Sequence, residues 1–289
     1  MHRIVLTVGS VGYLVPRADF AGRIHSVFAQ ACNIACHGTL LTLGAPGAAD
    51  GPTTLRLARG ALHDLRGLFD VGEVVRCRQA RMQTGRTELE WMQAGVWRPA
   101  PLRRLLPRRR IDEHLRHAGQ RLAQRRSMHT TSVIDREGAW VVSALRCACR
   151  ALDSERAVRH VARLAGWGEG LTPAGDDFLI GLMAGLDALA RDDPRRREFR
   201  RALAGALDAS TQRTTPIAAH YLRLAAGGHY TEPLVRLRNA LLCEDDGDAV
   251  DPALHSALAV GATSGADTVS GLLAGLGVWL PAPAAAEAA

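Results

Sequence analysis

The chain of 289 residues contains no lysine, so all 36 of its basic residues are arginines. This absence excludes a Schiff-base lysine and the phosphate-binding lysine of a Walker-type loop. Any anion must therefore be bound by arginine, by backbone N–H groups or by a metal ion. The formal net charge of +7 is consistent with anionic partners.

Aromatic residues and cysteines are also scarce, at 4% of the chain and six residues. A hydrophobic content of 47% can still fill a core, which must consist mainly of Ala, Leu and Val and therefore favours helices. The cysteines, at positions 32, 36, 77, 147, 149 and 243, match neither a zinc ribbon nor a disulfide framework. We expect free thiols in a reducing cytoplasm.

Long apolar runs are missing as well, and no signal peptide is visible before Pro16. We therefore expect a cytoplasmic protein without a membrane partner. The arginine-rich stretch 103–110 lacks interleaved aromatics, and no helix-turn-helix or RNA-binding motif accompanies it. We interpret it as a solvated linker and expect no nucleic acid partner, with a docking surface for an acidic subunit as the second interpretation.

The chain changes character near residue 110. Before this point, short alternating runs separated by Gly, Pro and Asp predict antiparallel strands of a small sheet or barrel. The predicted strands are 23–28, 39–43, 53–57, 73–78 and 86–91, and a helix could form near 16–22 or 58–69. After it, helical periodicity predicts an all-α region with helices at 112–126, 140–152, 154–165, 178–190, 195–209, 216–226, 232–242, 251–260 and 265–280.

The expected fold class is therefore α+β, with a β-rich N-terminal domain (1–110), an α-helical domain (111–280) and a disordered tail (281–289). The helix at 178–190 is apolar nearly all round and should be buried at the centre of its domain. Residues 175–186 and 264–276 resemble each other, because both place Gly and Asp at a helix start before a Gly-Leu-x-Ala-Gly-Leu stripe.

Three predicted helices begin with hydroxyl and small residues. Thr172 and Thr215 each precede a proline and suit the N-cap position, and Ser264 and Asp267 have the spacing of a capping box. A helix N-terminus offers unpaired N–H donors and a partial positive charge, so several converging ends could bind a phosphate or carboxylate. Ordinary helix caps are the alternative interpretation.

The segment 166–177 is the strongest candidate for a site. It contains Gly166, Gly168, Gly170 and Gly175, and glycines at this density let the backbone approach a ligand closely. Asp176 and Asp177 follow at the helix start, where two adjacent carboxylates are costly unless they bind a cation, an arginine or a substrate N–H. Mg²⁺ held by these two residues is therefore a candidate cofactor, and the sequence indicates no other.

Other candidates are less specific. His220 follows Thr215 on the same helix and could face the same pocket, although a lone helical histidine is more often a core or surface residue. Arg23 is a candidate anion clamp. Ser26 and Asn33 interrupt a strand region, where hydrogen bonding at strand ends explains them as well as ligand contact does.

At these residues the chain resembles the AllH-like family, long catalogued as a domain of unknown function. The resemblance is carried by Gly168-x-Gly-Leu-Thr-Pro-x-Gly-Asp-Asp-Phe-Leu179, by Thr263-Ser-Gly-Ala-Asp-Thr-x-x-Gly-Leu-Leu273, and by Gly22-Arg-Ile-His-Ser-Val-Phe28 with Asn33. It spans roughly residues 21 to 276. AllH is a subunit of oxamate carbamoyltransferase in the anaerobic breakdown of allantoin.

The resemblance implies a subunit of an enzyme that interconverts oxalurate plus phosphate with oxamate plus carbamoyl phosphate. Such an enzyme needs other carbamoyltransferase subunits, one of them similar to acyl-CoA synthetases, and a homo-oligomer also remains open. The small anionic substrate would be bound by backbone N–H groups of Gly168, Gly170, Gly175, Ser264 and Gly265, together with Thr172, Thr215, His220, Arg23, Ser26 and Asn33. The candidate catalytic residues are Asp176, Asp177 and Asp267.

Two other functions fit the same residues. One is a binding or regulatory protein that senses a small carboxylate and performs no chemistry. The other is a metal-dependent hydrolase that uses Asp176 and Asp177 as a pair.

Overall fold

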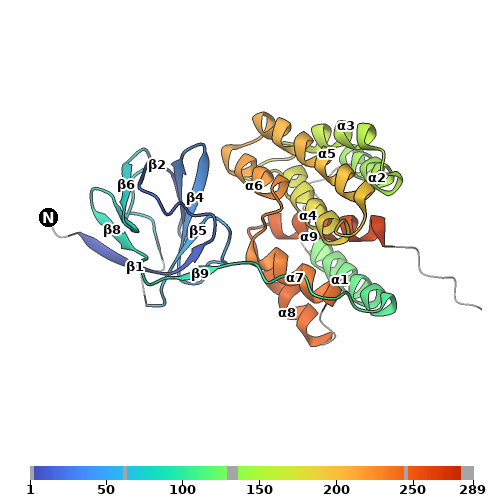
Figure 1. The fold of residues 1–289 in the computed structure, drawn as a ribbon, viewed down its shortest axis with the longest axis horizontal. Helices are drawn as coiled ribbons and strands as arrows, with labels where there is room; N and C mark the ends of the chain where they lie inside the picture. Colours follow the sequence, from blue (N-terminus) through green and yellow to red (C-terminus); the bar gives the residue numbers. More distant parts are fainter. Residues whose placement is uncertain (1–2, 61–63, 129–135, 244–246, 281–289) are drawn as a thin grey trace, which may run out of the picture. The chain divides into compact units, whose positions relative to one another are not determined.

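The computed structural model describes residues 3–60, 64–128, 136–243 and 247–280, so the predicted tail at 281–289 lies outside the described residues. The chain divides into two compact units, Met1–Pro99 and Ala100–Ala289. The first is built from strands and the second from helices, as Figure 1 shows. The predicted α+β class is therefore confirmed.

The N-terminal unit is a closed β-barrel. Within its described residues, β1 to β8 follow one another around the barrel in the order β5-β4-β3-β2-β6-β7-β8-β1, and β1 closes the ring by pairing with β5. A further strand, β9, extends the β8 side of β1. The strands are β1 (Ile4–Gly12), β2 (Phe20–Val27), β3 (Ala31–Cys36), β4 (Thr39–Gly44), β5 (Thr54–Leu57), β6 (Val74–Arg78), β7 (Arg81–Gln83), β8 (Thr87–Glu90) and β9 (Gly95–Trp97).

The barrel differs from the prediction in two respects. The β4–β5, β1–β8 and β1–β9 pairs are parallel, whereas only antiparallel strands were expected. Strand β2 begins at Phe20, and the described part of 58–69 contains no helix, so neither of the two helices considered before residue 70 is present there. Closure gives the unit a core of its own, formed by inward side chains such as Ile34, Leu43 and Leu89.

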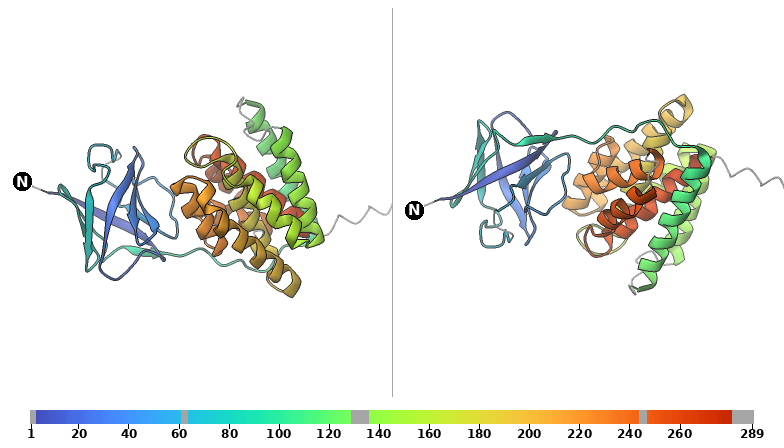
Figure 2. Two further views of the ribbon diagram at one scale, coloured as in Figure 1. Left: turned by 90° about the horizontal axis from the view of Figure 1, so that it is seen from above. Right: turned by 90° about the horizontal axis from the view of Figure 1, so that it is seen from below.

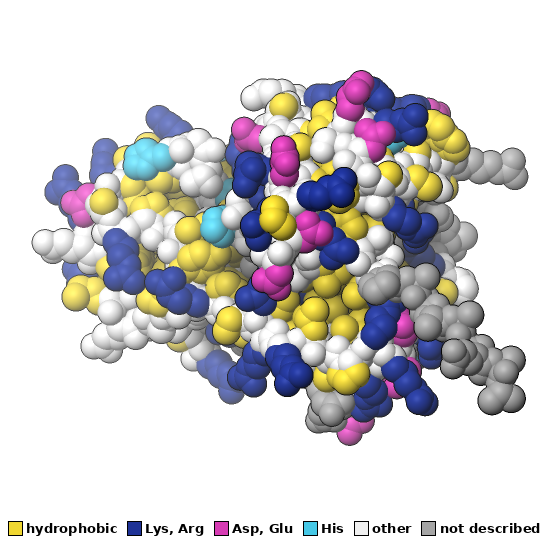
Figure 3. All heavy atoms as spheres, turned by 45° about the vertical axis from the view of Figure 1, so that its right-hand side comes forward, with side chains coloured by type: hydrophobic (Ala, Val, Ile, Leu, Met, Phe, Trp, Pro, Cys, Tyr) yellow, Lys and Arg dark blue, Asp and Glu magenta, His cyan; other side chains and the backbone are white. Residues whose placement is uncertain are grey.

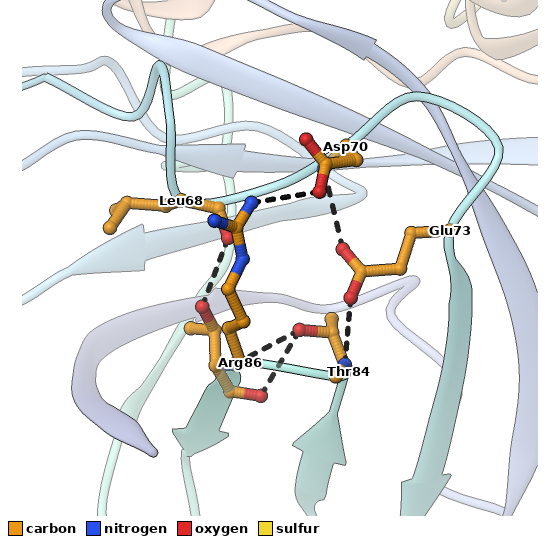
Figure 4. Close-up of polar contacts among 7 residues, drawn as sticks. Leu68, Asp70, Glu73, Thr84 and Arg86 are labelled. Atoms are coloured by element: carbon orange, nitrogen blue, oxygen red, sulfur yellow. Dashed lines mark hydrogen bonds and ion pairs between the residues drawn. The ribbon is translucent and has the colours of Figure 1, made fainter. Parts of the chain in front are cut away.

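The connection between β5 and β6 is fastened to the β7–β8 hairpin by polar contacts (Figure 4). Thr87 Oγ1 donates to the carbonyl oxygen of Leu68 over 3.1 Å, and Arg86 pairs with Asp70 at 2.8 Å. The backbone N–H of Asp70 donates to Glu73 at 3.3 Å. Thr87 is fully buried, so its bond to Leu68 is shielded from solvent. Together with the Arg86–Asp70 pair, it holds the connection between β5 and β6 against the β7–β8 hairpin.

The C-terminal unit is all-helical over its described residues. Its helices are α1 (Arg108–Met128), α2 (Arg136–Ala151), α3 (Ser154–Leu164), α4 (Ala174–Leu189), α5 (Pro194–Ser210), α6 (Pro216–Ala226), α7 (Glu232–Cys243), α8 (Val250–Leu258) and α9 (Ser264–Trp279), with short 3₁₀ turns at Thr211–Arg213 and Gly247–Ala249. No helix in the described parts of the chain is long and apolar enough to cross a membrane.

Helices α4 and α9 form the centre of this unit, and the two views in Figure 2 show the other helices around them. Both are apolar on nearly every face, as the sequence predicted for α4. Four glycines let their backbones touch. A Cβ atom on Gly181 would lie 1.9 Å from the carbonyl oxygen of Thr268, and one on Gly271 would lie 1.9 Å from that of Phe178.

These contacts are reciprocal, because Gly181, Phe178 and Leu182 stand 90 positions before Gly271, Thr268 and Leu272. Further along, Gly185 and Gly275 meet in the same manner. Contacts that advance together along both helices mean that α4 and α9 run parallel. Their N-termini therefore lie at the same end, and the resemblance seen in the sequence corresponds to two equivalent helices packed side by side.

The arginine-rich stretch 103–110 is not all linker, since α1 begins at Arg108. Arg108 pairs with Asp112, and Arg109 and Arg110 both pair with Glu113 across one turn of helix. Such pairs place the arginines on a solvated helix face. On the face shown in Figure 3, arginine side chains are spread over both parts of the molecule, and acidic side chains stand among them on the helical part.

Candidate functional site

The starts of α4, α6 and α9 meet around the glycine-rich loop that precedes α4. The hydroxyl oxygens of Thr172, before α4, and Ser264, the first residue of α9, lie 2.7 Å apart. Thr215, before α6, donates a hydrogen bond from its hydroxyl to the carbonyl oxygen of Leu171 in the loop. The predicted convergence of three helix starts is therefore present in the structure.

The capping pattern differs from the prediction at two of the three starts. The N-cap of α4 is Pro173 rather than Thr172, and the N-cap of α9 is Thr263, so Ser264 and Asp267 form no capping box. Thr215 is the N-cap of α6 as predicted, and it accepts a hydrogen bond from the N–H of Ala218 at 3.1 Å. The hydroxyl groups of Thr172 and Ser264 therefore do not cap their helices and are free to bond to each other.

The glycines have separate purposes. A Cβ atom on Gly175 would lie 2.0 Å from the carbonyl oxygen of Leu164, and one on Gly166 would lie 2.3 Å from that of Arg213. These two positions need glycine for packing. Gly168 and Gly170 are exposed and have φ angles of 108° and 91°, which favour glycine in the loop itself.

The backbone donors expected to hold an anion are partly in use. Gly175 donates its N–H to the carbonyl oxygen of Trp167 over 2.8 Å, and Gly265 donates to Val260 over 2.9 Å. Gly265 also packs tightly, because a Cβ there would lie 2.3 Å from the carbonyl oxygen of Ala257. These two N–H groups are therefore already bonded within the protein, and a ligand role for Gly175 and Gly265 stays a prediction.

Asp176 is fully buried and holds the loop together. Its Oδ1 accepts the N–H of Gly166 over 2.9 Å, and its Oδ2 accepts the hydroxyl of Thr214. Burial raises the pKa of Asp176, and these two donors act against that shift. Since both oxygens receive a donor from the chain, Asp176 links the loop to the start of α6, and it does not share a ligand-binding face with Asp177 as the paired interpretation required.

Asp177 is the carboxyl group of this pair that keeps an oxygen without a donor among the described residues. It is 5% exposed, and its Oδ2 is buried without a hydrogen-bond partner among the described residues. Burial raises the pKa of Asp177 to about 7. Hydrogen bonds from the hydroxyls of Ser264 and Thr172 act against this shift, while the negative charge of Asp267 adds to it. The group can therefore gain or lose a proton near neutral pH.

Asp177 lies in the wall of a cavity of about 120 Å³. The other walls come from α4, α6, α7, α8 and α9, together with the turns that follow α6 and α8. They are mostly apolar and include Ile180, Tyr221, Leu224, Leu234, Val260, Gly265 and Val269. Apart from Gly265, these wall residues were not predicted, because they are ordinary positions on helices distant along the chain.

Asp267 occupies the position in α9 that Asp177 occupies in α4, 90 residues earlier. It is 5% exposed, and its Oδ1 accepts a hydrogen bond of 3.1 Å from Arg126 near the end of α1. Burial raises the pKa of Asp267, and the guanidinium of Arg126 acts against this. Arg126 was not predicted as part of the site, since it comes from a helix 141 residues away.

His220 is buried on α6, and it is not among the described residues that line the cavity. Burial lowers its pKa to about 4, with a further contribution from the charge of Arg223. A neutral, buried ring beside Tyr221 is the core histidine that the sequence analysis gave as the alternative.

The three N-terminal candidates lie in the barrel. Asn33 on β3 is buried, donates to Ser26 on β2 over 3.1 Å and accepts from Thr42 on β4 over 2.9 Å. Arg23 on β2 is exposed and donates to the carbonyl oxygen of Gly72 over 3.0 Å. The bonds of Asn33 link neighbouring strands, and that of Arg23 links β2 to the turn before β6. A ligand role for Arg23, Ser26 and Asn33 stays a prediction.

The described residues contain no group of three or more His, Cys, Asp or Glu side chains arranged to hold a metal ion. Asp177 and Asp267 each have one buried oxygen without a partner in the described part of the chain. Each could accept an N–H or O–H donor from a ligand. The arrangement therefore suits hydrogen-bond donors better than anions, since carboxylates already lie at the positive ends of α4 and α9.

Comparison with known families assigns both parts of the chain to one family. A family model described as oxamate carbamoyltransferase subunit AllH matches residues 164–276, which include the loop and the starts of α4, α6 and α9. A second model, described as the AllH family N-terminal domain, matches residues 9–96 and so covers the barrel. No solved structure matches the chain. Because the two models together cover most of its length, the chain belongs to the AllH family.

Proposed function

We propose that this chain, as a carbamoyltransferase subunit, takes part in the interconversion of oxalurate plus phosphate with oxamate plus carbamoyl phosphate, and that Asp177 binds the carbamoyl end of the substrate. The family supports the role of subunit. The observation that carries the assignment to Asp177 is its buried Oδ2, which has no partner among the described residues and belongs to a side chain that lines a cavity.

The chemistry of the site favours the amide end of the substrate over its charged end. A phosphate or carboxylate placed at the starts of α4 and α9 would meet the carboxyl groups of Asp177 and Asp267, and two of the expected N–H donors are already bonded. The NH₂ group of a carbamoyl or oxamate moiety is a donor and complements Asp177. The charged end would then lie toward the exposed loop at Gly168 and Gly170, or on a partner subunit.

Asp177 also has the acidity that the reaction needs. In phosphorolysis of oxalurate, an oxygen of phosphate forms a bond to the carbamoyl carbon, the C–N bond breaks, and the departing oxamate nitrogen takes a proton. A carboxylic acid whose pKa is about 7 can donate that proton at neutral pH and recover it in the reverse direction. The hydroxyls of Thr172 and Ser264 would hold the carboxyl group in place.

The test is carbamoyl phosphate formation from oxalurate and phosphate by the chain combined with its partner subunits. We expect Asp177→Asn to reduce kcat about 100-fold or more, because positioned acid–base groups contribute roughly 10²–10⁴ in rate. Asp192→Asn, an exposed residue after α4, is the matched control and should leave turnover unchanged. Undiminished turnover by Asp177→Asn would refute the assigned role, and no carbamoyl phosphate with any partner subunit would refute the reaction.

A further inference from the structure

The two equivalent carboxyl groups differ in one respect that points to a ligand. Asp267 receives an N–H from the guanidinium group of Arg126, whereas no cation of the described chain is near enough to lower the pKa of Asp177. The two helices pack with reciprocal contacts around Gly181 and Gly271, and Asp177 and Asp267 occupy corresponding positions in their first turns. The donor that satisfies Asp267 is therefore a guide to what would satisfy Asp177.

The cavity beside Asp177 suits a cationic donor in its lining and its size. Its walls are mainly apolar, with Ile180, Leu224, Leu234 and Val269 among them, and they include the side chain of Asp177, whose buried Oδ2 has no partner in the described chain. A ligand that matches both features carries a cationic donor at one end and an apolar stem behind it. A volume of about 120 Å³ is slightly below that of an apolar cavity of about 150 Å³ that holds a benzene ring, which suits a planar head group and the first methylene groups of a stem.

We propose that this cavity binds an alkylguanidinium group, with the N–H fork on the free oxygen of Asp177 and the stem along the apolar walls. The planar guanidinium is less strongly hydrated than an ammonium group and donates from two nitrogens at once, so it loses less on entering an apolar site. The proposal uses the carboxyl group of the proposed function, and such a ligand would compete there with the carbamoyl end of the substrate.

The protonation state of Asp177 sets the expected pH dependence. The titratable groups that surround it are Asp176 on its own helix, Asp267 on α9, Tyr221 on α6, and His229 and Tyr230 between α6 and α7. Burial lowers the pKa of His229 and raises that of Tyr230, so both are neutral at pH 7 to 8. A cation requires ionised Asp177, hence binding should strengthen as the pH rises through about 7.

The experiment is calorimetric titration of the full chain with n-propylguanidine, n-propylamine and n-propylurea. We expect propylguanidine to bind at least about tenfold more tightly than the neutral isostere propylurea, since only the guanidine pairs with a charge. Its affinity should rise about tenfold from pH 6 to pH 8, because the ionised fraction of a group with a pKa of about 7 rises by that factor. Nα-acetylarginine amide tests the source: binding shows that an arginine of a partner protein also fits, and binding of propylguanidine alone indicates a free small molecule.

Asp177→Asn should abolish propylguanidine binding, and Asp192→Asn should retain it. Binding that survives in Asp177→Asn, equal affinity for propylurea, or affinity that falls with pH would overturn the proposal. A fold check by circular dichroism on both variants separates loss of the site from loss of structure. The outcome is independent of the proposed function: guanidine binding without oxalurate turnover refutes only the latter, and oxalurate turnover without guanidine binding refutes only this inference.

Discussion

The starts of α4 and α9 are two versions of one structure with different surroundings. Each places an aspartate in its first turn, Asp177 or Asp267, and each buries all but 5% of that side chain. At α9 the carboxylate meets Arg126 from α1, and at α4 the equivalent side chain meets a cavity. A buried carboxylate without a counter-charge reduces stability, so its retention at one of the two positions indicates a functional purpose.

The difference also separates structural acids from functional ones. Asp176 is as deeply buried as Asp177, but the N–H of Gly166 and the hydroxyl of Thr214 satisfy it. Burial and proximity to the loop therefore do not identify the functional residue. The informative property is an oxygen that the described chain leaves without a donor, and Asp177 combines this with a place in the cavity wall.

The largest expected effect tests whether the two helices are equivalent. Gly181→Ala and Gly271→Ala should each lower the free energy of unfolding by about 3 kcal/mol or more, because the added Cβ would meet a carbonyl oxygen 1.9 Å away in both cases. The measurement is urea denaturation of each variant. Similar losses would support the equivalence, and a large loss at one position with none at the other would contradict it.

Gly277→Ala is the matched control on α9, since a Cβ there has no neighbour within 4 Å. Alanine favours a helix over glycine by about 1 kcal/mol, so this variant should be as stable as the wild type or slightly more stable. A loss comparable to that of Gly271→Ala would show that α9 tolerates no alanine for reasons other than contact with α4.

Much of the fold could be predicted from local sequence patterns. Each of the nine helices listed above overlaps a predicted one, because apolar residues recur at helical spacing. Strand β3 was missed because its buried residues do not alternate, and the burial of Cys32, Asn33 and Ile34 in succession shows why. The parallel pairs of the barrel could not be predicted, because alternation reports a strand and gives no information on the direction of its partner.

The sequence predicted the meeting of three helix starts, and the structure pairs the aspartates differently from the prediction. In the sequence resemblance between 175–186 and 264–276, Asp177 corresponds to Asp267. The prediction instead paired the adjacent residues Asp176 and Asp177 as the functional carboxylates. Successive side chains on a helix point about 100° apart, and so one reaches the loop and the other the cavity. Arg126 and the cavity walls depend on tertiary packing, which a sequence pattern does not contain.

A second prediction concerns the stability cost of Asp177. Its folded pKa, about 7, is above the value near 4 of an unfolded aspartate, so folding favours the protonated form. The contribution of protonated Asp177 to the free energy of unfolding is fully present below pH 4 and is lost as the pH rises to about 7. The difference between the folded and unfolded pKa of Asp177 corresponds to about 4 kcal/mol at most, and a buried asparagine forfeits part of this gain. Asp177→Asn should therefore be roughly 2 kcal/mol more stable than the wild type above pH 7.

Thermal unfolding measured from pH 4 to pH 8 checks this prediction. The variant should be the more stable protein above pH 7, the two stabilities should become equal between pH 4 and pH 7, and the wild type should be the more stable protein near pH 4. Asp192→Asn, exposed and outside the site, should follow the wild type at every pH. A variant that is less stable than the wild type at pH 8 would show that ionised Asp177 has a partner in the folded protein, and the contrast with Asp267 would then disappear.

The substitution with the smallest expected effect leaves Asp267 at the start of α9 without a cation, as Asp177 is at the start of α4. Arg126→Met removes the cation from Asp267 and keeps the aliphatic part of the side chain. Because Arg126 is 38% exposed and its charge is partly screened by solvent, we expect the free energy of unfolding to fall by about 1 kcal/mol at neutral pH.

This loss should vanish as the pH falls and Asp267 becomes protonated. The control Arg116→Met, on the exposed face of α1, should have no effect at any pH. A pH-independent loss in Arg126→Met, measured by urea denaturation at pH 4 and pH 8, would mean that Arg126 contributes through packing, and that the two aspartates differ for a reason other than their cation.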